Sequence, residues 1–308
     1  MQNRIVEISS EGAYLSVSRG FMSVRVKDTE AGQVAIDDMA ALVVRGNGAS
    51  ISINLCARLA QANVPVVICG TDQAPASVLW PVDGHFAQGL RMQAQAVANK
   101  PLLKRLWAQM VRAKITAQAD VLALMELDAA DLRAMARRVK SGDAENLEAQ
   151  AARRYWLRLM GDDFRRDRAQ EGANAALNYG YTVLRAGAAR AIVAAGLHPS
   201  LSINHQSRGD ALRLADDLME PFRPWVDLRV KQLAGDGASL AAIVLTPETK
   251  RFLTAVLQLD LDTRHGASPL QLCMDRMAQS LVRVFTGDDA LMDLPGPALP
   301  LAATHGAS

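Results

Sequence analysis

Residues 71–85 read TDQAPASVLWPVDGH and lie between two halves of the chain with different hydrophobic periodicities. This stretch contains two prolines and a glycine, which favour turns over regular elements. Short runs rich in β-branched residues precede it, and long runs with apolar residues at three- and four-residue spacing follow it. We therefore predict an α+β fold, with a small N-terminal β domain followed by a larger all-α helical domain.

The first half reads as a series of short strands. The predicted strand segments include RIVEIS, AYLSVS, FMSVRVK, ALVVRG and VPVVICG. Between the last two, Ile53, Cys56, Leu59 and Ala60 recur at helical spacing and predict a single helix. We expect a β domain over residues 1–75, built as a sandwich, and a linker over residues 76–88.

The second half reads as helix, and we assign residues 89–293 to the larger α-helical domain. An apolar stripe at helical spacing comprises Leu103, Leu106, Trp107, Met110, Val111 and Ile115. Residues 174–196 are rich in Ala and Gly, which let helices approach closely, so we predict a central buried helix there. The tail, residues 294–308, has no periodicity and is expected to be flexible.

Composition excludes several classes of protein. Half of the 308 residues are hydrophobic, and the net charge of +2 does not by itself indicate a nucleic-acid binder. The three cysteines are widely spaced and contain no CxxC pair, which argues against a disulfide framework or a structural zinc site. No signal-peptide core and no apolar run long enough to cross a bilayer is present, so we expect a soluble cytoplasmic protein without a membrane partner.

Positive charge is unevenly distributed along the chain. Residues 84–119 contain no Asp or Glu. Their cationic residues are Arg91, Lys100, Lys104, Arg105, Arg112 and Lys114. Such a stretch is typical of a surface that follows the phosphates of a nucleic acid. For any single residue the alternative is an ordinary solvated position balanced by acids elsewhere.

Candidate metal ligands lie around HQSRGDALRLADDLMEPFRPWVD, residues 205–227. We predict a helix near residues 210–220 with Asp217 and Glu220 on its polar side, because they are three positions apart. The alternative is a solvated face with an Arg213–Asp217 ion pair. The buried stripe of this helix would comprise Ala211, Leu214, Ala215 and Leu218. His205, just before the helix, is either a ligand or a hydrogen-bonded structural residue.

Glu148 favours the metal hypothesis. Ala152, Tyr155 and Leu159 share its side of a predicted helix, and a glutamate beside an apolar stripe is costly unless it is paired or coordinates a cation. The alternative is a glutamate at the rim of the core. One imidazole and two carboxylates can bind a divalent metal, with Mg²⁺ or Mn²⁺ as the preferred ions.

Four motifs in order resemble a known family, the CRISPR-associated integrase of spacer acquisition, the first universal CRISPR-associated protein. They are NLEAQAARRYW (146–156), NAALNYGYTVLR (174–185), GLHPSLSINH (196–205) and DLMEPFRPWVD (217–227). The resemblance covers nearly the whole chain apart from about the last fifteen residues. The segment LWAQMVRAKITAQA (106–119) is most similar to members from type II systems.

The resemblance implies a catalytic metal, Mg²⁺ or Mn²⁺, held by Glu148, His205 and Glu220. Asp217 matches a second acidic position and is expected to support the ligands or to act as an occasional ligand. His198 lies outside the ligand set and is expected to be structural or close to DNA. Tyr155 either lies near the reacting phosphate or packs in the core, and core packing is the favoured interpretation.

The implied reaction is the insertion of foreign DNA fragments, the spacers, into a CRISPR array. The 3′-hydroxyl of a fragment attacks a phosphodiester at the edge of a repeat, and attack by water makes the protein an endonuclease. The implied partners are double-stranded DNA with 3′ ends, CRISPR repeat DNA, a second copy in a homodimer formed through the β domain, the small second CRISPR-associated protein, and a type II effector nuclease. Two alternatives remain open: a general metal-dependent DNA repair nuclease and a non-catalytic DNA-binding scaffold.

Overall fold

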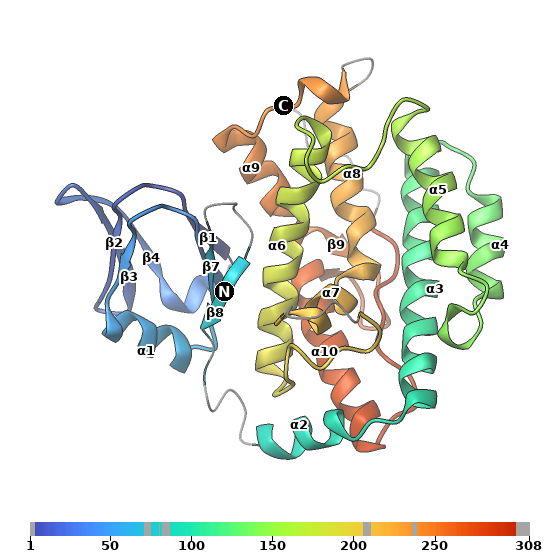
Figure 1. The fold of residues 1–308 in the computed structure, drawn as a ribbon, viewed down its shortest axis with the longest axis horizontal. Coiled ribbons are helices and arrows are strands. Elements are labelled where there is room, and N and C mark those ends of the chain that lie inside the picture. The colour runs from blue at the N-terminus through green and yellow to red at the C-terminus, as the bar shows by residue number, and fades with distance from the viewer. Residues whose placement is uncertain are drawn as a thin grey trace.

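An N-terminal β domain lies beside a larger helical domain in the computed structural model, at the left and right of Figure 1 respectively. This arrangement confirms the predicted α+β fold class. The structure describes residues 4–70, 75–79, 81, 87–205, 211–235 and 239–299. None of the helices in these ranges combines the length and the apolar character that a membrane crossing requires.

The described part of the β domain contains two four-stranded sheets. The first has the spatial order β1 (Arg4–Ile8), β5 (Met39–Val44), β7 (Val66–Cys69) and β8 (Pro75–Leu79). The second has the order β4 (Thr29–Ala35), β3 (Phe21–Val26), β2 (Tyr14–Ser18) and β6 (Ser50–Ile51). Apolar side chains from both sheets bury one common core, which includes Leu42 and Val66 from the first sheet and Leu15 and Met22 from the second.

The predicted helix of the β domain is present as α1 (Ile53–Gln61), but its buried face differs from the prediction. Ser52 caps the helix, since its hydroxyl accepts a hydrogen bond from the Leu55 backbone N–H. Leu55 and Leu59 are buried against the sheets, whereas Ile53 is 81% exposed. The cap explains the error, because Ile53 is the first helical residue and projects from the end of the helix.

Part of the predicted linker over residues 76–88 is a strand. Strand β8 pairs antiparallel with β7 and extends the first sheet to Leu79. The two prolines led us to place a loop here, but Pro75 is the first residue of an edge strand, where a missing backbone N–H leaves no ladder hydrogen bond unmade. The helical domain begins at Gln88, and residues 82–86 lie outside the described ranges.

The helical domain is built around two long helices. Asn99 caps α3 (Lys100–Leu124), in which the predicted stripe residues 106, 107, 110, 111 and 115 are buried and residue 103 is half-buried. Helix α6 (Ala173–Ala194) is the predicted central helix, and Figure 1 shows it next to the β domain, with α8 (Arg223–Ala234) and α3 on its other side. A Cβ atom at Gly180 would lie 2.4 Å from Val226 Cγ1, so glycine permits the close approach of α6 and α8.

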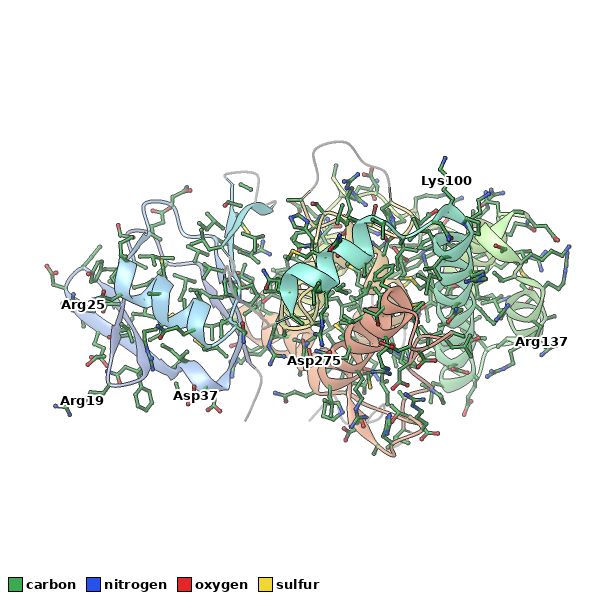
Figure 2. The ribbon with its side chains drawn as sticks, turned by 90° about the horizontal axis from the view of Figure 1, so that it is seen from below. Arg19, Arg25, Asp37, Lys100, Arg137 and Asp275 are labelled. Atoms are coloured by element: carbon green, nitrogen blue, oxygen red, sulfur yellow. The ribbon has the colours of Figure 1, made fainter. Side chains whose placement is uncertain are left out.

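The remaining elements complete this domain. The helices are α2 (Gln88–Ala96), α3 (Lys100–Leu124), α4 (Ala130–Arg138), α5 (Leu147–Met160), α6 (Ala173–Ala194), α7 (Arg213–Leu218), α8 (Arg223–Ala234), α9 (Pro247–Thr254) and α10 (Leu270–Thr286). A short ribbon pairs β9 (Asp260–Leu261) with β10 (Ser268–Pro269). Figure 2 shows Asp275 within the helical domain, where its carboxylate pairs with Arg190 and joins α10 to α6.

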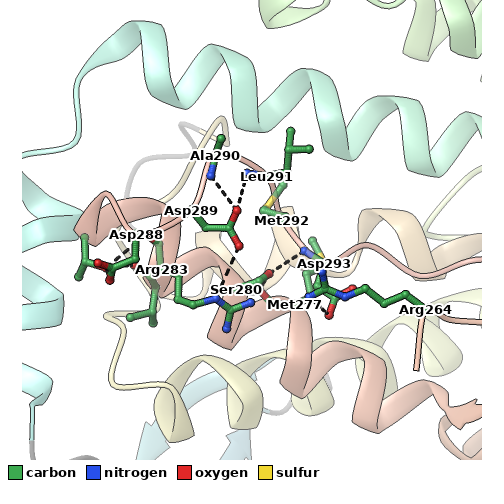
Figure 3. A network of polar contacts seen from close by, with 12 residues as sticks. Arg264, Met277, Ser280, Arg283, Asp288, Asp289, Ala290, Leu291, Met292 and Asp293 are labelled. Atoms are coloured by element: carbon green, nitrogen blue, oxygen red, sulfur yellow. Dashed lines mark hydrogen bonds and ion pairs between the residues drawn. The ribbon is translucent and has the colours of Figure 1, made fainter. Parts of the chain in front are cut away.

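Contacts hold both the segment that follows α10 and the first residues of the predicted flexible tail. In the segment after α10, the Asp289 carboxylate accepts the backbone N–H of Ala290 and pairs with Arg283, as Figure 3 shows. Further on, the backbone N–H of Asp262 donates to Pro297, and Ala298 is buried. The prediction of a flexible tail from residue 294 is therefore wrong for residues 294–299, and residues 300–308 lie outside the described part.

Candidate functional site

Asp217 organises the loop that carries His205. Its carboxylate is fully buried and accepts hydrogen bonds from the backbone N–H groups of Ile203, Asn204 and His205 at 2.6–3.1 Å. The same carboxylate lies 2.6 Å from Nδ1 of the His205 ring. This hydrogen bond raises the pKa of His205, although burial opposes it. Asp217 thus fixes both the backbone and the imidazole of His205.

The prediction that Asp217 and Glu220 lie together on the polar side of one helix is wrong. Asp217 is 0% and Glu220 is 3% exposed, so the alternative of a solvated acidic face is excluded as well. Helix α7 ends at Leu218, and residues 220–222 form a 3₁₀ turn that breaks the assumed helical wheel. The loop that contains Ile203 packs over the side of α7 that we expected to be its polar side.

Lys114 joins the two predicted glutamate ligands. Its Nζ lies 2.6 Å from Glu148 Oε1 and 2.5 Å from Glu220 Oε2. The two carboxylate oxygens are therefore separated by no more than about twice that distance. Burial alone would lower the pKa of Lys114, but the two carboxylates raise it above its usual value. The structure thus brings Glu148 and Glu220 together around a single positive charge.

Glu220 has a second cationic neighbour. Arg223 Nε lies 3.2 Å from Glu220 Oε1, and the guanidinium group also stacks over the Tyr181 ring at 5.0 Å. Lys114 and Arg223 together lower the pKa of Glu220 below its usual value, although its burial acts in the opposite direction. Glu220 is therefore a buried glutamate held in its charged form, which is the form a metal ligand requires.

A buried carboxyl group lies behind this site. Asp227 accepts a hydrogen bond from the Tyr155 hydroxyl at 3.1 Å and another from the Tyr181 hydroxyl at 2.5 Å. Tyr155 is completely buried, which agrees with the favoured interpretation that it packs in the core. Burial raises the pKa of Asp227 to about 7, although the two hydroxyl hydrogen bonds work against that shift.

Replacing Asp227 by Asn is expected to change how stability depends on pH. Because the pKa of Asp227 is raised in the folded state, its stabilising contribution is complete below the unfolded pKa near 3.8 and is lost as the pH rises through about 7. From pH 5 to pH 8, the wild type should lose about 2 kcal/mol of unfolding free energy relative to Asp227→Asn. Urea unfolding in EDTA at several pH values measures this difference. If the unfolding free energies of the wild type and of Asp227→Asn depended equally on pH, the raised pKa of Asp227 would be contradicted. The control is the exposed substitution Asp163→Asn, which should leave the pH dependence of the wild type unchanged.

The site opens into a cavity of about 1260 Å³, whose lining has seven Arg and Lys residues against the four acidic residues Glu7, Glu11, Asp216 and Asp227. Its cationic lining residues are Arg45, Lys114, Arg166, Arg168, Arg185, Arg223 and Lys250. His205 also lines the cavity, and its ring meets Trp107 edge-to-face with centroids 5.8 Å apart. Of the six cationic residues in the stretch 84–119, Lys114 alone is among the lining residues.

Sequence reasoning missed most of this basic lining. Arg45 lies between β5 and α1, and Lys250 lies in α9. The two residues are far apart in the sequence, yet both approach Glu7 of β1. Arg185 is half-buried and paired with Asp216 at 2.8 Å, so only part of its charge is available to a ligand. The fold, rather than a run of basic residues, gathers the positive charge.

A divalent ion at this site would need donor atoms from Glu148, His205 and Glu220 arranged around it. Within the ranges that the structure describes, no group of three or more His, Cys, Asp and Glu side chains is arranged to hold a metal. At the site, the Lys114 ammonium group lies between Glu148 and Glu220. With Nδ1 of His205 engaged by Asp217, Nε2 is the ring nitrogen available to a metal. Glu148, Glu220 and His205 offer oxygen and nitrogen donors of the kinds that Mg²⁺ or Mn²⁺ accepts, and an ion between the two glutamates would require the ammonium group to move aside.

The remaining candidate residues are Asp217 and His198. Asp217 contacts His205 and the loop backbone, which matches the predicted role of supporting the ligands. His198 Nδ1 lies 2.8 Å from the Ser200 hydroxyl, and the His198 backbone N–H donates to Gln95. These contacts favour a structural role for His198.

Comparison with known proteins places the chain in a family. The family model described as CRISPR associated protein Cas1 matches residues 6–242. A CRISPR-associated endonuclease Cas1 from Neisseria meningitidis serogroup C (strain 8013) is 33% identical over 283 residues, which are 91% of this chain and 91% of that relative.

Two solved structures share the fold at low sequence identity. A casposase bound to integration product matches with a TM-score of 0.76 at 19% identity, over 99% of this chain and 94% of the casposase chain. A chain of a Cas6-RT-Cas1–Cas2 complex matches with a TM-score of 0.72 at 17% identity, over 94% of this chain and 35% of that longer chain. Because the family model spans most of the sequence and the Neisseria relative matches along nearly its full length, this chain belongs to the CRISPR associated Cas1 family.

Proposed function

We propose that this Cas1 family member is a metal-dependent DNA integrase that inserts spacer fragments into a CRISPR array, and that cuts DNA when water replaces the attacking hydroxyl. One observation carries the proposal: Glu148 and Glu220 are held around Lys114, which lines the same large cavity as His205. The endonuclease name of the Neisseria relative and the integration product bound to the casposase support the same chemistry.

The site residues have separate roles in the proposed reaction. In the reaction, the 3′-oxygen of the fragment forms a bond to phosphorus as the bond from phosphorus to the 3′-oxygen of the repeat strand breaks. A metal held by Glu148, His205 and Glu220 would neutralise charge on the phosphodiester and align the reacting groups. Asp217 keeps the imidazole of His205 in one orientation, with Nε2 free.

The basic cavity supplies the substrate-binding surface. Arg166, Arg168 and Lys250 among its lining residues are suited to bind the phosphates of a DNA end. The proposed partners are a DNA fragment with 3′ ends, repeat DNA, a second copy of this chain bound through the β domain, and the small second CRISPR-associated protein. The Cas6-RT-Cas1–Cas2 complex supports an assembly of this kind. Use of Mg²⁺ or Mn²⁺ and membership of a type II system, with its effector nuclease, stay predictions.

A joining assay with blocked ends tests this function. The wild-type protein and its small partner are incubated with a repeat-bearing plasmid and a labelled fragment that ends in a 3′-hydroxyl or a 3′-phosphate. Label should enter the plasmid at a repeat edge only with the 3′-hydroxyl and only with Mn²⁺ or Mg²⁺. Cleavage without joining would favour a repair nuclease, and DNA binding without either reaction, with or without metal, would favour a scaffold.

A further inference from the structure

Lys114 lies at the point where three structural elements of the candidate site meet. It projects from the middle of α3, Glu148 lies in the first turn of α5, and Glu220 begins the 3₁₀ turn after α7. The Lys114 side chain is 12% exposed, and Glu148 is 26% exposed. The ammonium group is thus enclosed by both carboxylates rather than directed into solvent as a phosphate-binding lysine would be.

A positive charge at this position is a structural requirement. Two carboxylates at this separation repel each other, and the repulsion is strong because Glu220 is removed from water. Arg223 offsets the charge of Glu220 at Oε1, whereas Lys114 contacts Glu220 at Oε2 and also pairs with Glu148. Lys114 is therefore the group that allows Glu148 and Glu220 to stay charged and close together.

A divalent ion bound by both glutamates would need the same space. Metal–oxygen distances for Mg²⁺ are about 2.0–2.1 Å, shorter than the present nitrogen–oxygen distances, so an ammonium group and a metal cannot both lie between the two carboxylates. Lys114 also lines the cavity of about 1260 Å³, which gives its flexible side chain a route away from the carboxylates without repacking of the core.

We propose that Lys114 is a resident counter-ion that competes with the divalent metal for the Glu148–Glu220 pair and turns into the cavity when metal binds. The proposal rests on the proposed metal ligands. It means that the apparent metal affinity is reduced by the ion pairs that must first break. It also means that metal binding adds one positive charge to the wall of the cavity that would receive DNA phosphates.

Metal titration of Lys114 variants tests this competition. Free Mn²⁺ is followed by its electron paramagnetic resonance signal as it is added to the full-length protein without DNA. Lys114→Met, which removes the charge and keeps the length, should bind Mn²⁺ at least about fivefold more tightly than the wild type. Lys104→Met, an exposed change on the same helix, should bind like the wild type. Lys114→Arg should bind no more tightly than the wild type, because it keeps the competing charge.

Thermal denaturation gives a second readout. In EDTA, Lys114→Met should melt at a lower temperature than Lys114→Arg, since its two glutamates lack a counter-ion. Addition of Mn²⁺ should raise the melting temperature of Lys114→Met by more than that of the wild type.

The possible failures are distinguishable. Equal or weaker Mn²⁺ binding by Lys114→Met, or tighter binding by Lys114→Arg, overturns the competition. If Glu220→Gln leaves wild-type Mn²⁺ binding unchanged, the ligand set of the proposed function is wrong, and the competition fails with it. If Glu220→Gln abolishes binding while Lys114→Met has no effect, the ligand set stands and only the role of Lys114 is overturned.

Discussion

Replacing Glu220 by Gln is expected to reduce the joining of DNA fragments by about 10³-fold or more, because it removes a charged ligand from the proposed metal site, where the ion would stabilise the transition state by several kcal/mol. Glu220 is buried and held in its charged form by Lys114 and Arg223, so the neutral amide removes a full negative charge from the proposed ligand set. The rate of product formation at saturating DNA measures this effect. DNA binding should change little, since the basic lining of the cavity is retained.

The matched control is Glu248→Gln, because Glu248 is exposed and forms its ion pair with Arg251, which is exposed as well. Its joining rate should equal that of the wild type. Glu220→Gln leaves Lys114 and Arg223 with less negative charge, so the assay is run well below the melting temperature of the variant. A Glu220→Gln protein that is folded, binds DNA and joins fragments within about tenfold of the wild-type rate would contradict the assigned role.

Replacing Asp217 by Ala is expected to lower the free energy of unfolding by about 3 kcal/mol or more. The substitution leaves the backbone N–H groups of Ile203, Asn204 and His205 without their acceptor inside the protein. It also removes the partner of the His205 ring. Urea unfolding of the metal-free protein measures the stability change.

The same variant should also lose metal affinity by about 10- to 100-fold, because the orientation of His205 depends on Asp217. Asp163→Ala, in an exposed turn after α5, is the control and should alter neither quantity beyond about 0.5 kcal/mol. A stability loss for Asp217→Ala that is no larger than that of the control would show that the loop does not depend on this carboxylate.

Periodicity predicted the parts of the fold that are governed by burial. The buried stripe of α3 and the Ala- and Gly-rich central helix α6 were predictable, because their apolar or small residues repeat at helical spacing over many turns. The short elements were less predictable. Strand β8 contains the proline that we expected to break structure, and the exposure of Ile53 depends on where Ser52 caps α1.

The proximity of Glu148 and Glu220 was predicted, but the environment of the candidate residues was not. The helical spacing of Asp217 and Glu220 indicated a shared face, yet the face is buried because a loop 12–14 residues earlier in the chain folds over it. Lys114 was counted among the phosphate-following cations, since no local pattern links it to a glutamate 34 residues later. Tertiary packing creates this contact, and only the folded structure reveals it.

Anomalous scattering from Mn²⁺ in crystals of the wild-type protein tests the central claim most directly. The account predicts one manganese peak between Glu148 and Glu220, within about 2.0–2.6 Å of an oxygen of each, with Nε2 of His205 as a further ligand and the Lys114 ammonium turned into the cavity. A manganese peak only at other acidic residues, with Lys114 still paired to both glutamates at saturating Mn²⁺, would contradict it.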